Sequence, residues 1–229
     1  MTESDNIEWL DSDAAFGPKY KKVITQLNWI NKYLGNESHT LRIFKKELGN
    51  SNLQKGSVVR VLDLGCASGY ILHKIGELLI QSGYKPMLIG IDSNSRAIDL
   101  AEMQLAQYDH KLILGYVNAD YLIPEVDFLL STHFIYHLSS SALIDFLKLN
   151  THKVTQGIVF SELRSNPWSK SLFGIFNRFS GFEKEVLQDG IKALKRAPTH
   201  EEFQSTFSAF KNLQVQKAWL FRTLIYGKL

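Results

Sequence analysis

Residues 59–70 read VRVLDLGCASGY and join a short apolar run to an acid and two spaced glycines. Valine and leucine dominate residues 58–64, which is typical of a strand buried on both faces of a parallel sheet. Gly65 and Gly69 follow that run directly. A glycine there can adopt positive φ and lets backbone N–H groups approach a ligand without an intervening Cβ. The stretch therefore predicts a ligand-binding turn between a first buried strand and a helix.

The same alternation of strand and helix continues along the chain and sets the fold class. The predicted strands are 58–64, 86–91, 112–117, 126–131 and 157–162, and the predicted helices are 19–34, 40–48, 70–81, 95–108 and 140–149. Such βαβ units imply a parallel sheet that is covered on both faces. Two further strand candidates, 213–216 and 219–226, have no helix between them, so they can join only as an antiparallel hairpin. We therefore expect an α/β fold with a Rossmann-like, seven-stranded, mostly parallel sheet that ends in a C-terminal hairpin.

The domain organisation follows from the predicted helices that are not part of the strand–helix alternation. Residues 1–50 are predicted to form a helical N-terminal extension or cap. Residues 51–229 are predicted to form the ligand-binding domain, with a helical lid inserted at about 165–209.

Composition narrows the class of protein. The chain has 229 residues, 45% of them hydrophobic, and a net charge of only +3. No basic block stands out, so nucleic acid is not expected as a partner. The single cysteine, Cys66, rules out an internal disulfide and favours a reducing compartment. The acidic N-terminus does not have the pattern of a secretory signal, and no apolar run is as long as a bilayer span. We expect a cytoplasmic protein.

The glycine spacing separates the possible ligands. A dinucleotide-binding G-x-G-x-x-G turn would need glycines at Ala67 and Tyr70, and a P-loop would need a Gly-Lys-Ser/Thr sequence. An NAD(P)-dependent reductase is therefore a weak alternative.

Three later stretches each follow a predicted strand: IGID at 89–92, NADYLIP at 118–124 and STHFIYHL at 131–138. Together with residues 63–69, where Ala67 stands at the middle glycine of D-x-G-x-G-x-G, they resemble class I methyltransferases that use S-adenosylmethionine (SAM). The resemblance implies SAM as cofactor, S-adenosylhomocysteine as its product, and a set of cofactor-binding residues. This set is Asp63, Gly65, Cys66, Ala67, Gly69, Asp92, Ser93, Asp120, Tyr121, Ser131 and Thr132.

The chemistry of these positions agrees with that implication. The carboxylate of Asp63 and the turn amides suit the zwitterionic methionine end, and Asp92 can accept both ribose hydroxyls. Asp120 can accept from the adenine amino group, with Tyr121 and Ser93 beside the ring. The structural alternatives are that Asp63 caps the following turn and that Asp92 caps the next helix, although Ser95 is the better cap by residue type and position.

His133 is the best candidate for a general base, because it lies just beyond the fourth predicted strand and titrates near neutral pH. The alternative is a polar residue that only shapes the wall of the pocket. His137 is the second catalytic candidate, with a loop-stabilising role as its more favoured interpretation. Nucleobase methyltransferases often carry Asn/Asp-Pro-Pro-Tyr/Phe where STHF stands here, which also disfavours nucleic acid. No acidic cluster suited to a divalent metal is evident, so no metal is expected.

The region after the fifth predicted strand points to the acceptor of the methyl group. Residues 166–179 place aromatic side chains on one helical face, which suits a lid over an apolar substrate. Peripheral contact with a membrane surface and simple packing on the domain are the alternatives. The substrate-binding candidates are His133, Arg164, Trp168, Phe173 and Arg196. For the two arginines, pairing with Glu162 or Glu202 is the structural alternative.

Residues 161–167 (SELRSNP), 189–199 (DGIKALKRAPT) and 27–35 (LNWINKYLG) resemble a subgroup of quinone- and phenolic-lipid-type methyltransferases found beside polyketide pathways. The chain departs from the subgroup's pattern at Glu162, Ala193 and Pro198. The resemblance implies methyl transfer, which we expect to be to oxygen, on a hydrophobic phenol, quinol or polyketide-derived molecule. A methyltransferase-like module that binds a partner protein without catalysis is the alternative. The oligomeric state is not predicted.

Overall fold

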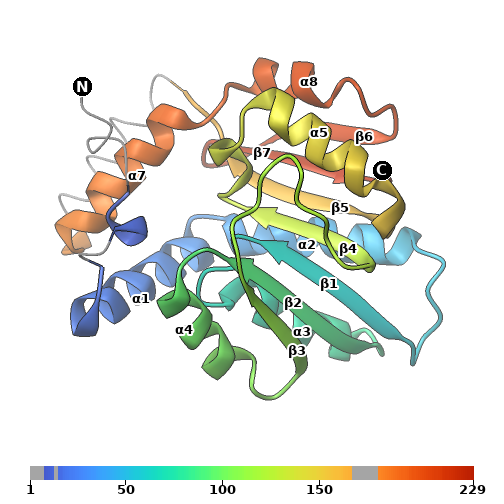
Figure 1. Cartoon of the computed structure of the whole chain (residues 1–229), viewed down its shortest axis with the longest axis horizontal. Helices are drawn as coiled ribbons and strands as arrows, with labels where there is room; N and C mark the ends of the chain where they lie inside the picture. The colour runs from blue at the N-terminus through green and yellow to red at the C-terminus, as the bar shows by residue number, and fades with distance from the viewer. Residues whose placement is uncertain (1–7, 13–14, 167–179) are drawn as a thin grey trace.

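A seven-stranded sheet organises the computed structural model, which describes residues 8–12, 15–166 and 180–229 (Figure 1). The strands are β1 (Val58–Leu64), β2 (Lys85–Asp92), β3 (Asp109–Leu114), β4 (Val126–Thr132), β5 (Val154–Leu163), β6 (Leu213–Ala218) and β7 (Arg222–Gly227). The α-helices are α1 (Gly17–Tyr33), α2 (Asn36–Asn50), α3 (Tyr70–Gln81), α4 (Ser95–Leu105), α5 (Ser140–Asn150), α7 (Lys184–Arg196) and α8 (His200–Phe207). Short 3-10 turns are η2 (Trp9–Asp11), η3 (Ile135–His137) and η4 (Thr151–Lys153).

The strand order is β3-β2-β1-β4-β5-β7-β6. The first five strands are mutually parallel, and β7 runs antiparallel to both β5 and β6. The predicted mostly parallel sheet with an antiparallel C-terminal hairpin is therefore confirmed. The order reverses between β1 and β4, which is where parallel α/β sheets place their ligands.

Helices cover both faces of the sheet, as predicted (Figure 1). On one face α2 and α3 pack against it, and Phe44 of α2 meets Phe128 of β4 with ring centroids 4.9 Å apart. On the other face lie α5 and α8, where Phe207 meets Phe160 of β5 at 6.3 Å. Within the predicted extension 1–50, α2 therefore belongs to the main core. In contrast, α1 packs with η2 and α7 beyond the ends of the strands.

Local sequence explains where the helices begin. The side chains of Asn94 and Ser139 accept backbone N–H groups at the starts of α4 and α5. Thr199 and Glu202 form a reciprocal capping box at α8. These residues satisfy N–H groups that the first helical turn leaves without partners.

Two predicted strands were placed wrongly. The strand predicted at 112–117 is β3 at Asp109–Leu114, because this edge strand uses the polar residues 109–111 in its pairing with β2. The strand predicted at 219–226 begins only at Arg222, because residues 219–221 form the hairpin turn. Leu220 and Phe221 hold φ of 55° and 58° there, which the sequence could not signal, because glycine or asparagine usually occupies such positions.

Candidate active site

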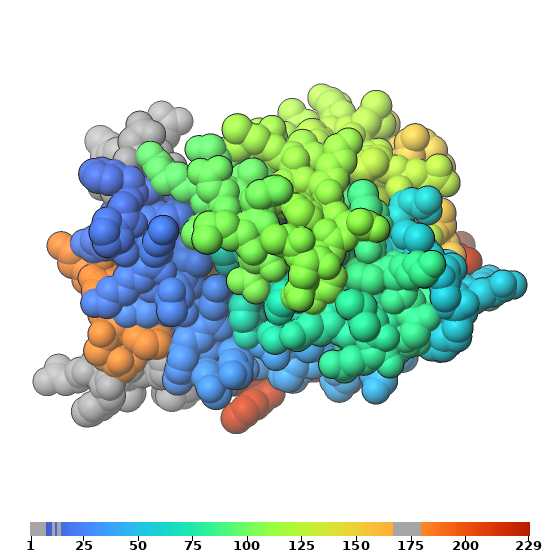
Figure 2. Space-filling model, turned by 90° about the horizontal axis from the view of Figure 1, so that it is seen from below, coloured from blue at the N-terminus to red at the C-terminus, as the bar shows by residue number. Residues whose placement is uncertain are grey.

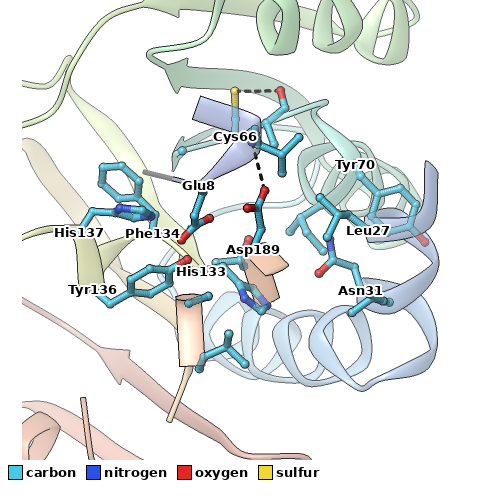
Figure 3. A pocket seen from close by; sticks show the side chains of 18 of the residues that line it. Glu8, Leu27, Asn31, Cys66, Tyr70, His133, Phe134, Tyr136, His137 and Asp189 are labelled. Atoms are coloured by element: carbon cyan, nitrogen blue, oxygen red, sulfur yellow. Dashed lines mark hydrogen bonds between the residues drawn. The ribbon is translucent and has the colours of Figure 1, made fainter. Parts of the chain in front are cut away.

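A cavity of about 1100 Å³ lies at the carboxyl ends of the parallel strands. Its walls come from the β1–α3 turn, the end of β2, the loops after β3 and β4, α1, α7 and the β6–β7 turn. Figure 3 shows Leu27, Asn31 and Tyr70 on one side of it, across from Phe134, Tyr136 and His137. Small-molecule sites usually measure about 300–1,000 Å³, so this cavity lies at the upper end of that range.

Asp63 forms the deepest acidic group of the cavity. The residue is 2% exposed, and its Oδ1 has no hydrogen-bond partner among the described residues. Burial, followed by the charges of Asp92 and Glu162, raises the pKa of Asp63 to about 8. A buried acceptor without a partner costs free energy unless a ligand binds it. The carboxylate therefore fits a cationic group such as an ammonium.

The turn after β1 brings backbone rather than side chains to the cavity. Gly65 has a φ of +68°, and a Cβ built on it would lie 2.6 Å from Cδ2 of Phe134. An alanine there would collide with that ring, so the close approach requires glycine. Ala67 also adopts a left-handed φ of +47°, although it has a Cβ. It stands where the resembling motif has its middle glycine.

Asp92 links the ends of β1 and β2. Its Oδ2 accepts the N–H of Ala67 at 2.8 Å, and its Oδ1 accepts the N–H of Asn94 at 2.9 Å. The N-cap of α4 is Asn94, whose Oδ1 accepts the N–H of Arg96 at 3.0 Å, so neither Asp92 nor Ser95 caps this helix. Asp92 also lines the cavity, where a carboxylate can accept hydrogen bonds from a diol.

The structure gathers most of the predicted cofactor-binding residues at the cavity. Those that line it are Asp63, Gly65, Cys66, Ala67, Asp92, Ser93 and Thr132. Two others lie behind its wall. Gly69 packs against α4, where its Cβ would lie 3.3 Å from that of Ala101, and the Ser131 hydroxyl donates to Glu162 Oε1 at 2.7 Å. Both positions support the turn from outside the cavity.

Asp120 and Tyr121 are not brought to the cavity. Asp120 is exposed, and Tyr121 packs against the core of the sheet face that α5 covers. The reason is the earlier position of β3, which ends at Leu114 and leaves Gly115, Tyr116 and Val117 to line the cavity. Tyr116 is 71% exposed as well as lining the cavity, and the sequence analysis missed it because it was assigned to the strand.

His133 lies directly after β4 in a left-handed conformation, with a φ of +60°. It lines the cavity, and its buried Nε2 has no hydrogen-bond partner in the described part of the chain. Burial, and secondarily the positive charge of Arg222, lowers the pKa of His133 well below its ordinary value. The imidazole is therefore neutral at physiological pH, and the same burial makes it a weaker base than a free imidazole.

His137 lies among aromatic rings. Its ring stacks on Tyr136 with centroids 4.4 Å apart and lies 5.9 Å from Phe134 (Figure 3). Burial and the nearby Arg196 lower the pKa of His137 to about 4. The geometry suits a residue that stabilises the loop after β4.

Two charged residues that the sequence analysis did not assign to the site lie buried beside it. Arg222, at the start of β7, lines the cavity and is 2% exposed. Glu162, in β5, accepts at Oε1 from Ser131 Oγ and from the N–H groups of Phe134 and Ile135. Burial raises the pKa of Glu162 to about 7, although these hydrogen bonds and the charge of Arg222 act to lower it. The sequence offered one indication of Arg222: it is the only charged residue of the strand 222–227 and stands at its first position.

An N-terminal segment closes one side of the cavity. Asp189 of α7 accepts the N–H groups of Trp9 and Leu10 at 2.7 and 3.1 Å, and Asn94 Nδ2 donates to the Leu10 carbonyl at 2.8 Å. Figure 2 shows the blue N-terminal part of the chain beside the orange surface of α7 and the green surface of the central part of the chain. The segment thereby joins α7 to the loop that carries Asp92.

The predicted substrate-binding residues have different surroundings. Arg164 lines the cavity, and its buried Nε has no hydrogen-bond partner among the residues described. Arg196 also lines the cavity and pairs with Glu8 at 3.5 Å, rather than with Glu162 or Glu202. Trp168 and Phe173 lie outside the described residues.

Comparison with known proteins identifies the fold. No protein-family model and no curated protein matches the sequence. The plantazolicin methyltransferase BpumL in complex with S-adenosylhomocysteine aligns with a TM-score of 0.63 and 14% identity, over 93% of this chain and 91% of BpumL. The CMeT domain of the citrinin polyketide synthase aligns with a TM-score of 0.61 and 16% identity, over 93% of this chain and 57% of that one.

Human N-acetylserotonin methyltransferase in complex with SAM aligns with a TM-score of 0.59 and 13% identity, over 94% of this chain and 57% of the human chain. The chain therefore has the fold of class I SAM-dependent methyltransferases, as the sequence motifs indicated.

The described residues contain neither a candidate membrane span nor a candidate metal site. No helix within them is both long and apolar enough to cross a membrane. They also contain no cluster of three or more histidine, cysteine, aspartate or glutamate side chains that could hold a metal ion.

Proposed function

We propose that this protein is an enzyme that transfers a methyl group from SAM to an oxygen atom of a hydrophobic small molecule. The observation that carries the proposal is the buried Asp63 carboxyl group, with an unpartnered oxygen among the described residues, in a large cavity of a methyltransferase fold. The structural neighbours support the choice of cofactor, because BpumL and the human enzyme were each solved with S-adenosylhomocysteine or SAM.

The residues of the cavity fit such a cofactor. Asp63 would bind the ammonium of its methionine end, beside the turn that begins at Gly65. Asp92 would accept from the ribose hydroxyls, at the strand end where acids recognise this group in nucleotide sites. The loop 115–117 would flank the adenine, a role that we transfer there from Asp120 and Tyr121 because of where β3 ends.

When bound, SAM supplies a methyl group already activated by its sulfonium, so the chain's own residues have three tasks: to hold the acceptor, to exclude water and to take a proton. His133 would take the proton of the acceptor hydroxyl at Nε2, since the residue lines the cavity and this buried nitrogen has no partner among the described residues. His137 would hold the loop after β4 through its ring contacts. The N-terminal segment and α7 would exclude water from one side.

The part of the cavity lined by α1, α7 and the hairpin turn supports a hydrophobic acceptor. It is formed by apolar side chains of α1, α7 and the hairpin turn, namely Leu27, Ile30, Leu34, Val186, Leu194, Leu220 and Phe221. The neighbours are consistent with a natural-product acceptor, since BpumL was also solved with a desmethylPZN analogue. Contact with a membrane surface and a cytoplasmic location stay predictions.

Isothermal titration with S-adenosylhomocysteine tests the proposal. We expect one binding site per chain for the wild type, and weaker binding for Asp92→Ala by about 1–3 kcal/mol. Arg60→Gln is a matched control, because that side chain is exposed on β1 and does not line the cavity. Absence of binding at high micromolar protein would refute the proposal.

A non-catalytic methyltransferase-like module is the second candidate. This candidate would be indicated by a cofactor site that Tyr70 and the N-terminal helix block, or by cofactor binding without turnover. Tyr70 lines the cavity, and its hydroxyl donates to Glu37 of α2. The cavity volume favours the enzyme, and incubation with SAM and a panel of alkylphenols would separate the two candidates.

A further inference from the structure

Arg222 is a buried cation whose hydrogen-bonding capacity the protein leaves unused. Its Nε and Nη1 are buried and have no hydrogen-bond partner within the described ranges. A guanidinium carries five N–H donors in a planar fork that matches a carboxylate. Burying such a group without acceptors is costly, so these donors are expected to serve a ligand or water.

Glu162 does not fill this role. Glu162 is the buried acid whose charge acts on Arg222. The two side chains nevertheless form no ion pair, because none of the ion pairs of the described residues, which require a nitrogen–oxygen distance of at most 4.0 Å, joins them. Its Oε1 is occupied by three donors of β4 and the following loop. Glu162 therefore organises the loop that carries His133 and leaves the Arg222 fork to the cavity.

The position of Arg222 relates it to the acceptor side of the site. In the sheet it is the register partner of Leu163, the last residue of β5, and of Ala218. Arg164 comes directly after β5, and its buried side-chain Nε is a second guanidinium nitrogen without a partner among the described residues. Its backbone N–H donates to the Phe221 carbonyl at 2.7 Å. Both arginines line the cavity, and Arg222 is close enough to His133 to act on its charge.

The charges at the strand ends are thus divided, while Glu8, Asp189 and Arg196 also line the cavity, from the N-terminal segment and α7. The acids Asp63 and Asp92 lie at the ends of β1 and β2, whereas Arg164 and Arg222 lie at the edge formed by β5 and the hairpin. The turn beside Arg222 contributes Leu220 and Phe221, both in left-handed conformations that are unfavourable for such residues. This edge therefore offers a cationic group next to apolar surface.

We propose that Arg222, assisted by Arg164, anchors an anionic group of the methyl acceptor, so that the substrate is an aromatic hydroxy acid with an apolar tail. The inference rests on the proposed function and narrows its substrate class. The carboxylate accepts from the Arg222 fork, the tail lies on Leu220 and Phe221, and the hydroxyl faces His133. Arg222 is a specificity residue rather than a catalytic one.

A matched pair of ligands tests the anchor. The probes are 6-heptyl-2-hydroxybenzoate and 3-heptylphenol, which differ only in the carboxylate, titrated into the protein saturated with S-adenosylhomocysteine. We expect the wild type to bind the acid at least tenfold more tightly than the phenol. Arg222→Gln should remove that preference while leaving the affinity for the phenol within about twofold, and Arg222→Lys should retain part of it. Arg60→Gln, which removes an exposed cation, should behave as the wild type.

The outcomes separate this inference from the proposed function. Equal affinity of the wild type for both probes would overturn the anchor, and this result needs no variant to fold. An equal loss for both probes in Arg222→Gln would also overturn it, because the arginine would then support only the structure. If S-adenosylhomocysteine does not bind but the preference for the acid persists in its absence, the anion site stands and the proposed methyl transfer falls.

Discussion

Replacing Asp63 by asparagine removes a titratable carboxyl group from the cavity wall and keeps the side chain's shape. Folding raises the pKa of this carboxyl from 3.8 to about 8, chiefly through burial. The folded state therefore holds a proton that the unfolded chain releases at lower pH. The stabilising effect of that proton is complete below about pH 4 and is lost as the pH rises through 8.

The magnitude follows from the size of the shift. Each pH unit between the two pKa values changes the free energy of unfolding by roughly 1.4 kcal/mol, so the wild type loses about 5 kcal/mol from this group by pH 8. Asparagine does not titrate. The stability of Asp63→Asn relative to the wild type should therefore rise by a similar amount between pH 4 and pH 8.

Urea unfolding of both proteins at pH 5, 6, 7 and 8 measures this difference. Glu162, whose pKa is also raised, is present in both proteins, so their difference isolates Asp63. The same variant should bind S-adenosylhomocysteine at least tenfold more weakly. It should also lose the proton release that we expect on binding to the wild type at pH 7, as measured by titration in buffers of different ionisation enthalpy. Parallel stability curves for the two proteins would refute the reasoning.

Three further changes test neighbouring parts of the site. Ala67→Gly should raise the free energy of unfolding by about 1 kcal/mol, because glycine relieves the left-handed strain, and a loss of stability by urea unfolding would contradict this. Gly65→Ala should destabilise the fold by about 1–3 kcal/mol, because its Cβ would meet the Phe134 ring; an unchanged unfolding midpoint would disprove that contact. His133→Gln should slow methyl transfer by about 10²–10⁴-fold at unchanged affinity for S-adenosylhomocysteine, and a rate near that of the wild type would assign His133 to the pocket wall.

The parts of the fold that the sequence predicted are those encoded by local periodicity. The buried run that forms β1, the glycine turn and the repeated strand–helix units each carry a pattern that one window of sequence reveals. The C-terminal hairpin then follows because two strands with no helix between them can join only as an antiparallel pair, whereas the strand order was not predicted. The β3 edge strand was placed three residues late because its polar start carries no buried pattern, and this error displaced the predicted adenine-binding residues.

The parts of the site that the sequence did not predict depend on contacts between distant segments. Arg222 lines the cavity only because β7 pairs with β5, and Glu162 lies beside it through its bonds to β4 and the following loop. The Leu220–Phe221 turn has no residue type that marks it. The contact of residues 9–10 with Asp189 joins positions about 180 apart in the chain. No local pattern reports such pairs, since each half is ordinary in its own window.

A crystal structure with S-adenosylhomocysteine tests the central claim most directly. We predict that the ligand's amino group lies within hydrogen-bond distance of Asp63, that its ribose hydroxyls bind Asp92, and that its adenine lies beside Tyr116 and Val117. A nucleoside bound elsewhere, or residues 65–68 occupying the space it needs, would contradict the account.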